Sequence, residues 1–79
     1  MNVIYKQKAN FTENYLQPLL RAVDQEVEEV GYAAEEDDKG YLYNELVIIT
    51  FQNGYTIEVN VHMDSLLAMA KDALREMPL

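Results

Sequence analysis

The chain has 79 residues, one histidine and no cysteine, which excludes disulfides and thiolate metal sites and suits a single domain over residues 1–79. Fourteen acidic and six basic side chains give a net charge of −8, which argues against direct nucleic-acid binding because a polyanion is repelled. No stretch approaches the roughly 20 apolar residues of a membrane span, and Met1 to Asn10 lacks the apolar core of a secretory signal. We therefore expect no membrane partner, and the lack of cysteine fits a reducing cytoplasm.

The first predicted element is a helix from Phe11 to Val30 with a kink or break near Pro18. Its apolar positions recur at steps of three and four residues: Leu16, Leu20, Val23, Val27 and Val30. Proline inside a helix removes a backbone hydrogen bond and clashes with the preceding turn. The alternative is a helix that begins near Tyr15 to Gln17, with the proline in its first turn. Val3 to Tyr5 could add an edge strand.

Strands are predicted from Leu42 to Phe51, by β-branched and aromatic content, and from Tyr55 to His62, by clean alternation. A strand at Tyr32 to Ala34 is left open. The turn at Gln52-Asn53-Gly54 makes a hairpin of the two strands.

The length of the hairpin loop decides which strand residues face each other. A two-residue loop sets polar side chains against apolar ones. A three-residue loop, with Gly54 in the left-handed conformation of a bulge, sets Ile49 against Ile57 and Val47 against Val59. We predict the second register, because it makes one face of the sheet continuously apolar.

A final helix is predicted after Asp64, a favourable N-cap residue, and it ends at Pro78. Its buried face is expected to hold Leu67, Ala70, Leu74 and Met77. The predicted fold is α+β, with the order α-β-β-β-α in two layers: an antiparallel sheet with two helices on one face. Without a strand at Tyr32 the order becomes α-β-β-α.

The negative charge is concentrated in one part of the chain. Between Asp24 and Glu45 lie nine acidic side chains and one basic side chain, Lys39, a net −8, whereas the remaining residues are neutral together. A local block of like charge creates a field that attracts a basic partner. The residues predicted to bind such a partner are Asp24, Glu28, Glu35, Glu36, Asp37, Asp38 and Glu45.

Catalysis, metals and cofactors find no support in the sequence. His62 has no acid or nucleophile at motif spacing, and three glycines form no phosphate-binding loop. Read as a calcium loop from Glu35, the sequence places Lys39 and Leu46 at ligand positions, which breaks the motif. We expect no enzyme activity, no cofactor and no dedicated metal site.

The order α-β-β-β-α resembles the double-stranded RNA-binding domain. That family grips phosphates with lysines at the start of its last helix, whereas this helix opens with Asp64-Ser65-Leu66-Leu67. The resemblance is therefore one of element order, and an RNA-binding function is rejected.

A second resemblance concerns the segment NELVIITFQNGYTIEVNVHMDSLLAMAKDAL, from Asn44 to Leu74. Together with the length and acidity, it looks like small proteins encoded by phages and mobile elements. In its short helix–sheet–helix plan and its carboxylates, the chain is similar to anti-CRISPR inhibitors. The resemblance implies an inhibitor in the cytoplasm of a bacterial host. It would act as a DNA mimic at the basic nucleic-acid-binding site of a protein such as a CRISPR effector.

The alternative is a homo-oligomeric or adaptor module held by apolar contacts. In the predicted register Leu46 and Ile48 lie on the sheet face away from the helices, and Tyr41 and Tyr43 are close to them in sequence. Exposed aromatic and apolar side chains on a sheet are common interface anchors. These four residues are the predicted oligomer interface, for example of a homodimer.

Overall fold

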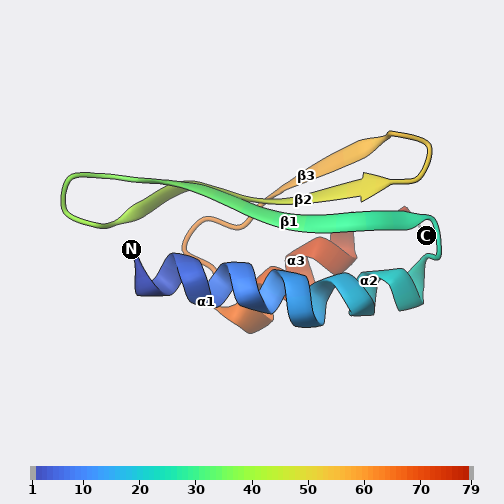
Figure 1. The fold of residues 1–79 in the computed structure, drawn as a ribbon, viewed down its shortest axis with the longest axis horizontal. Helices are drawn as coiled ribbons and strands as arrows, with labels where there is room; N and C mark the ends of the chain where they lie inside the picture. Colours follow the sequence, from blue (N-terminus) through green and yellow to red (C-terminus); the bar gives the residue numbers. More distant parts are fainter. Residues whose placement is uncertain (1, 79) are drawn as a thin grey trace.

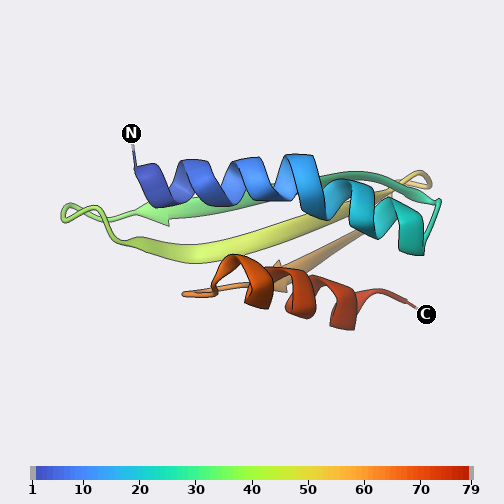
Figure 2. The same cartoon turned by 90° about the horizontal axis from the view of Figure 1, so that it is seen from below.

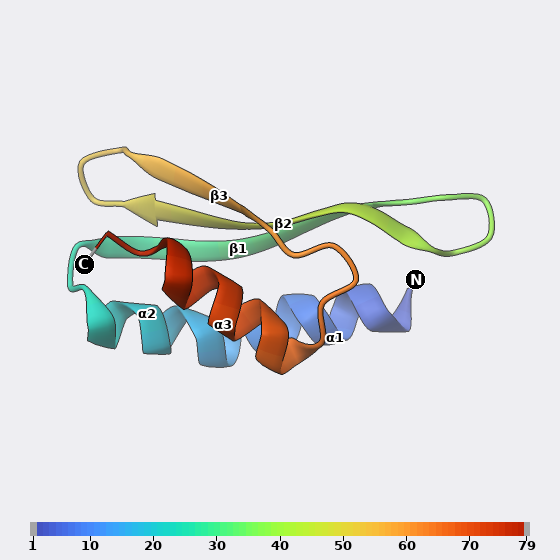
Figure 3. The ribbon, with the colours of Figure 1, turned by 180° about the vertical axis from the view of Figure 1, so that it is seen from behind.

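A computed structural model describes residues 2–78 (Figure 1). The order of elements is α1 (Val3–Phe11), the π-helical turn η1 (Thr12–Leu16), α2 (Gln17–Val23), β1 (Val27–Glu36), β2 (Leu42–Phe51), β3 (Thr56–Asn60) and α3 (Leu66–Glu76). The strands form one antiparallel three-stranded sheet in the order β1-β2-β3. The segments α1, η1 and α2 form one continuous helix, which we call the long helix. The long helix and α3 lie on the same face of this sheet (Figures 1 and 3). The predicted α-β-β-β-α fold is therefore confirmed, and the strand left open at Tyr32 is part of β1.

The N-terminal helix begins and ends earlier than the apolar spacing predicts. Asn2 caps it, since its Oδ1 accepts the Tyr5 N–H at 3.0 Å, so Val3 to Tyr5 is helical and adds no edge strand. The helix stops at Val23, and Val27 and Val30 lie in β1. A bulge between Val27 and Glu29 places the two valines on the same buried face at a three-residue spacing. Because a three-residue spacing of apolar residues is also typical of a helix, the sequence pattern predicted a helix as far as Val30.

Pro18 does not end the helix, because the turn before it is widened. The Gln17 N–H donates to the Thr12 carbonyl, five residues back, which is the hydrogen bond of a π-turn. In a regular α-helix a four-residue step drifts by about 40°, and a wider turn offsets this drift. Residues at four-residue intervals, from Lys8 to Leu20, are consequently all buried.

The β2–β3 hairpin has the predicted register. Val47 pairs with Val59 and Ile49 with Ile57. The Phe51 N–H donates to the Tyr55 carbonyl at 2.8 Å, and Gly54 has a φ of 89°, as a three-residue loop with a bulge requires.

We expect Gly54→Ala to lower the free energy of unfolding by about 1–2 kcal/mol, since a side chain disfavours the left-handed conformation. Urea denaturation measures this. The matched control is Gly31→Ala, where φ is not positive and an added Cβ meets nothing within 4 Å. The control should be neutral or slightly stabilising. An equal loss in both variants would contradict the bulged turn.

The core lies between the sheet and the helices. The long helix runs along β1, and α3 runs along β3 (Figure 2). Fully buried side chains come from each layer, including Leu20, Ile49 and Met69. The start of α3 differs from the prediction, because Ser65 is its cap and accepts the Ala68 N–H at 3.2 Å. The buried face of α3 is also shifted, and Leu67, expected in the core, is 72% exposed.

Among residues 2–78, no helix combines the length and the apolar composition needed to cross a membrane.

Candidate functional site

Within the acidic block from Asp24 to Glu45, the exposed acidic side chains form two groups at opposite ends of β1. The first includes Glu28 and Glu29, and the second runs from Glu35 to Asp38. At about 3.3 Å per strand residue, Glu29 and Glu35 are about 20 Å apart along the strand. The uncharged residues Val30–Ala34 separate them. The acidic block of the sequence is therefore two clusters and not one continuous row.

The second group, which we call the acidic hairpin end (Glu35, Glu36, Asp37 and Asp38), is exposed throughout. Figure 1 shows this end of the β1–β2 hairpin extending past the start of the long helix. Within the described residues none of its carboxylates forms an ion pair. Two of them have local hydrogen bonds: Asp37 accepts the Lys39 and Tyr41 N–H groups at 2.9 Å, and Glu35 accepts from the Asn44 side chain at 2.6 Å. Most of the charge at this end is free to meet a partner.

Asp24 has a structural role at the opposite end of β1. It is partly buried, and its Oδ1 accepts the Glu26 N–H at 2.9 Å in the turn between α2 and β1. The exposed acidic side chains next to it, Glu28 included, remain available to a partner.

Glu45 does not belong to the acidic surface, contrary to the prediction. Its side chain is 2% exposed and pairs with Lys8, whose Nζ lies 2.5 Å from Oε1. The Tyr32 hydroxyl donates to Oε1 at 2.7 Å, and the Met63 N–H donates to Oε2 at 2.6 Å. Glu45 precedes Val47 by two residues, so it lies on the same inward face of β2. Through these three contacts, the buried Glu45 side chain connects β2 to α1, to β1 and to the β3–α3 loop.

The pKa values in this cluster follow from burial and hydrogen bonding. Burial raises the pKa of Glu45, but hydrogen bonds from Lys8, Met63 and Tyr32 outweigh it and hold the pKa below its ordinary value. Burial, together with the hydrogen bond to Glu45, raises the pKa of Tyr32. Glu45 is therefore a carboxylate and Tyr32 a neutral donor at neutral pH.

A cavity of about 760 Å³ opens beside this cluster. We call it the amino-terminal cavity. It lies between the first turns of α1, the β1–β2 turn with the start of β2, and the β3–α3 loop. Its lining includes Ile4, Lys8, Tyr41, Glu45, Asp64 and Leu66. Lys8, Tyr32 and Asp64 were not predicted as members of any site. One sequence signal indicated a buried charge here: Glu45 lies an even number of residues before Val47 and Ile49, so strand alternation places it on their buried face.

The four residues of the predicted oligomer interface lie in three places. Leu46 and Ile48 lie on the outer face of the sheet, which no element in residues 2–78 covers (Figures 1 and 3). Their β1 neighbours on that face are Ala33 and Gly31, and both are small. Tyr41, in contrast, is 69% exposed at the amino-terminal cavity, and Tyr43 pairs with Glu35 near the hairpin end. The four residues therefore do not form one patch.

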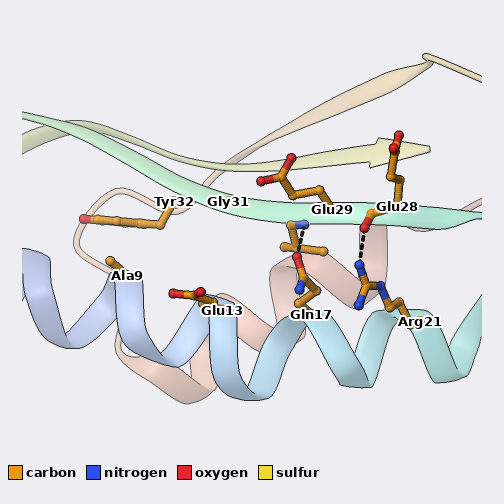
Figure 4. A pocket seen from close by; sticks show the side chains of 9 residues that line it. Ala9, Glu13, Gln17, Arg21, Glu28, Glu29, Gly31 and Tyr32 are labelled. Carbon is orange, nitrogen blue, oxygen red and sulfur yellow. Dashed lines mark hydrogen bonds between the residues drawn. The ribbon is translucent and has the colours of Figure 1, made fainter. Parts of the chain in front are cut away.

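A groove of about 510 Å³ separates the long helix from the free edge of β1 (Figure 4). Two helix side chains reach across it to the strand backbone. Gln17 Oε1 accepts the Val30 N–H at 2.9 Å, and the Arg21 guanidinium donates to the Glu28 carbonyl. These contacts occupy backbone groups that an edge strand otherwise offers to another chain.

In the part of the chain that the structure describes, no three carboxylate or histidine side chains gather closely enough to hold a metal ion. His62 is exposed, and its Nδ1 lies 3.6 Å from Glu45 Oε2.

The fold and these surfaces define a small α+β protein with an acidic hairpin end and a cavity lined by apolar and charged side chains. Comparison with known protein families, curated proteins and solved structures finds no match for the chain.

Proposed function

We propose that this protein is a binding protein that uses the acidic hairpin end to occupy a basic surface of another protein. The observation that carries the proposal is the exposure of Glu35 to Asp38, without ion-pair partners among residues 2–78, at the end of a hairpin. Uncompensated charges on an extended element attract a partner of opposite charge and orient it.

The partner that suits such charge best is a protein whose basic groove ordinarily holds nucleic acid. The anti-CRISPR-like role, in which an inhibitor from a phage or mobile element mimics DNA, is one form of this function. Glu35 and Glu36 end β1, and Asp37 and Asp38 follow it in the turn, so four consecutive carboxylates lie at one exposed end of the sheet. A CRISPR effector is therefore the first partner to test.

The test compares two triple variants with the same net charge. The first, Glu35→Gln/Glu36→Gln/Asp38→Asn, removes three charges from the hairpin end and keeps Asp37, which stabilises the turn. The second removes three exposed charges elsewhere: Glu13→Gln, Glu58→Gln and Glu76→Gln. Each variant changes the net charge from −8 to −5.

We expect the hairpin variant to lose about tenfold or more in affinity for the effector, and the second variant to lose less than about threefold. The measurement is displacement of labelled DNA from effector complexes, at about 50 mM and about 500 mM salt, since screening weakens charge-driven binding. Equal losses in the two variants would show that only net charge matters. Unchanged inhibition by the hairpin variant would reject the proposed surface.

The outer sheet face supports a second candidate, a homodimer or adaptor through Leu46 and Ile48. The uncovered face with its small neighbours Gly31 and Ala33 favours a contact there. Ile48, however, is paired with Glu58, so two copies would bring like charges together. Sedimentation of the samples used for the displacement experiment distinguishes a monomer from a dimer.

A further inference from the structure

The amino-terminal cavity adjoins the acidic hairpin end, with which it shares Asp37, and the charges of its lining do not balance. Lys8 is neutralised by Glu45 at 2.5 Å. Two further carboxylates, Asp37 and Asp64, line the cavity and have no ion pair among residues 2–78. The remaining basic side chain in the lining is His62, which faces Glu45 and not these two carboxylates. The lining therefore offers negative charge to a ligand.

Asp64 is the less satisfied of the two carboxylates. Its Oδ2 is buried and has no hydrogen-bond partner within the described chain. Burial, followed by the neighbouring carboxyl of Asp72, raises the pKa of Asp64 to about 6, while Lys8 acts in the opposite direction and Glu45 adds to the rise. A carboxylate in these surroundings is destabilised until a cation compensates it.

The rim of the cavity is apolar. Ile4 is 55% exposed, Tyr41 69% and Leu66 38%. Beside them Met63 is exposed and has a φ of 61°, a conformation that its N–H bond to Glu45 helps to hold. Apolar side chains around an acidic site match a ligand with a hydrocarbon stem and a cationic end. The Tyr41 ring can also contact a cation with its face.

We propose that the amino-terminal cavity receives a lysine or arginine side chain of the basic partner protein. The stem of that side chain lies against Ile4 and Leu66, and its cationic group lies near Asp64 and Asp37. This inference rests on the proposed function, because it assigns a specific contact to the same basic partner. The volume of about 760 Å³ leaves room for the residues that flank the inserted side chain.

The first experiment uses a lysine analogue and an uncharged analogue with a similar hydrocarbon stem. N-acetyl-lysine-N′-methylamide and N-acetyl-norleucine-N′-methylamide are titrated separately into the ¹⁵N-labelled protein and followed by NMR. We expect the lysine analogue to shift the amide signals of Tyr41, Met63 and Leu66, with an affinity at least about fivefold higher than that of norleucine. Equal affinities, or shifts confined to the acidic hairpin end, would overturn the proposal.

Two variants and a control keep the test specific. Asp64→Asn removes the charge with little change in shape, and Ile4→Ser changes an exposed position of the rim. Each is expected to weaken the lysine analogue about threefold or more, whereas Glu76→Gln, an exposed residue outside the cavity, should leave its affinity unchanged. Unaltered affinity in both cavity variants would overturn the proposal.

The two proposals fail in different ways. If the lysine analogue does not bind but the hairpin variant loses the effector, the proposed function stands and the cavity has no part in it. If the analogue binds in the cavity but the hairpin variant inhibits normally, the cavity is a cation site and the hairpin function is wrong.

Discussion

Replacing Glu45 with alanine is expected to lower the free energy of unfolding by about 3–5 kcal/mol, because Lys8 is left as a buried charge without a partner. The Lys8 side chain is 9% exposed and cannot reach water freely. The Tyr32 hydroxyl and the Met63 N–H also lose their acceptor. A domain of this size is stable by about 5–10 kcal/mol in total. The variant should therefore lose about a third or more of its stability and unfold at a clearly lower urea concentration, as circular dichroism followed during urea titration would show.

The double variant Lys8→Met/Glu45→Leu separates the cost of an unpaired charge from the value of the pair. Replacing a buried ion pair with apolar side chains of similar size is often neutral or stabilising. We expect the double variant to recover the part of the loss that comes from the unpaired Lys8 charge, whereas the Tyr32 hydroxyl and the Met63 N–H stay without their acceptor. Glu58→Ala, at an exposed position of β3, is the matched control and should cost less than about 0.5 kcal/mol. A double variant no more stable than Glu45→Ala would contradict this account of the cluster.

The second large effect concerns two adjacent leucines of α2. Leu20 is 0% exposed, and Leu19 is 42% exposed. Leu20→Ala is expected to lower the free energy of unfolding by about 2–5 kcal/mol, because a cavity remains in a core that repacks only partly. Leu19→Ala, the matched control, should cost less than about 1 kcal/mol. Urea denaturation of both variants measures the difference.

The pair also tests the helix after Pro18. Without the π-turn at Thr12–Leu16, the helix beyond it would be rotated, and Leu20 would leave the core. Similar losses in the two leucine variants would mean that α2 does not face the sheet as described.

Local patterns in the sequence determined the hairpin and the fold class. The alternation from Leu42 to His62 and the Asn53-Gly54 turn predicted the register, since strand pairing and turn geometry depend on near neighbours along the chain. The α-β-β-β-α order followed from the same short-range signals. The exposed carboxylates of the hairpin end were also predictable, because a run of charge close to turn residues cannot be buried.

Only the tertiary structure decided where the first helix ends and what Glu45 does. The three-residue spacing of Val27 and Val30 is typical of a helix face. In the structure both valines face the core from β1, because a bulge formed by pairing with β2 adds one residue between them. Glu45 is 37 residues from Lys8 in the sequence, yet it forms the buried ion pair that distinguishes it from the acidic residues before it. Charge alone predicted an exposed residue, and a long-range contact made it part of the core. The sequence by itself thus determined the hairpin and its acidic end, whereas packing between distant segments created the amino-terminal cavity.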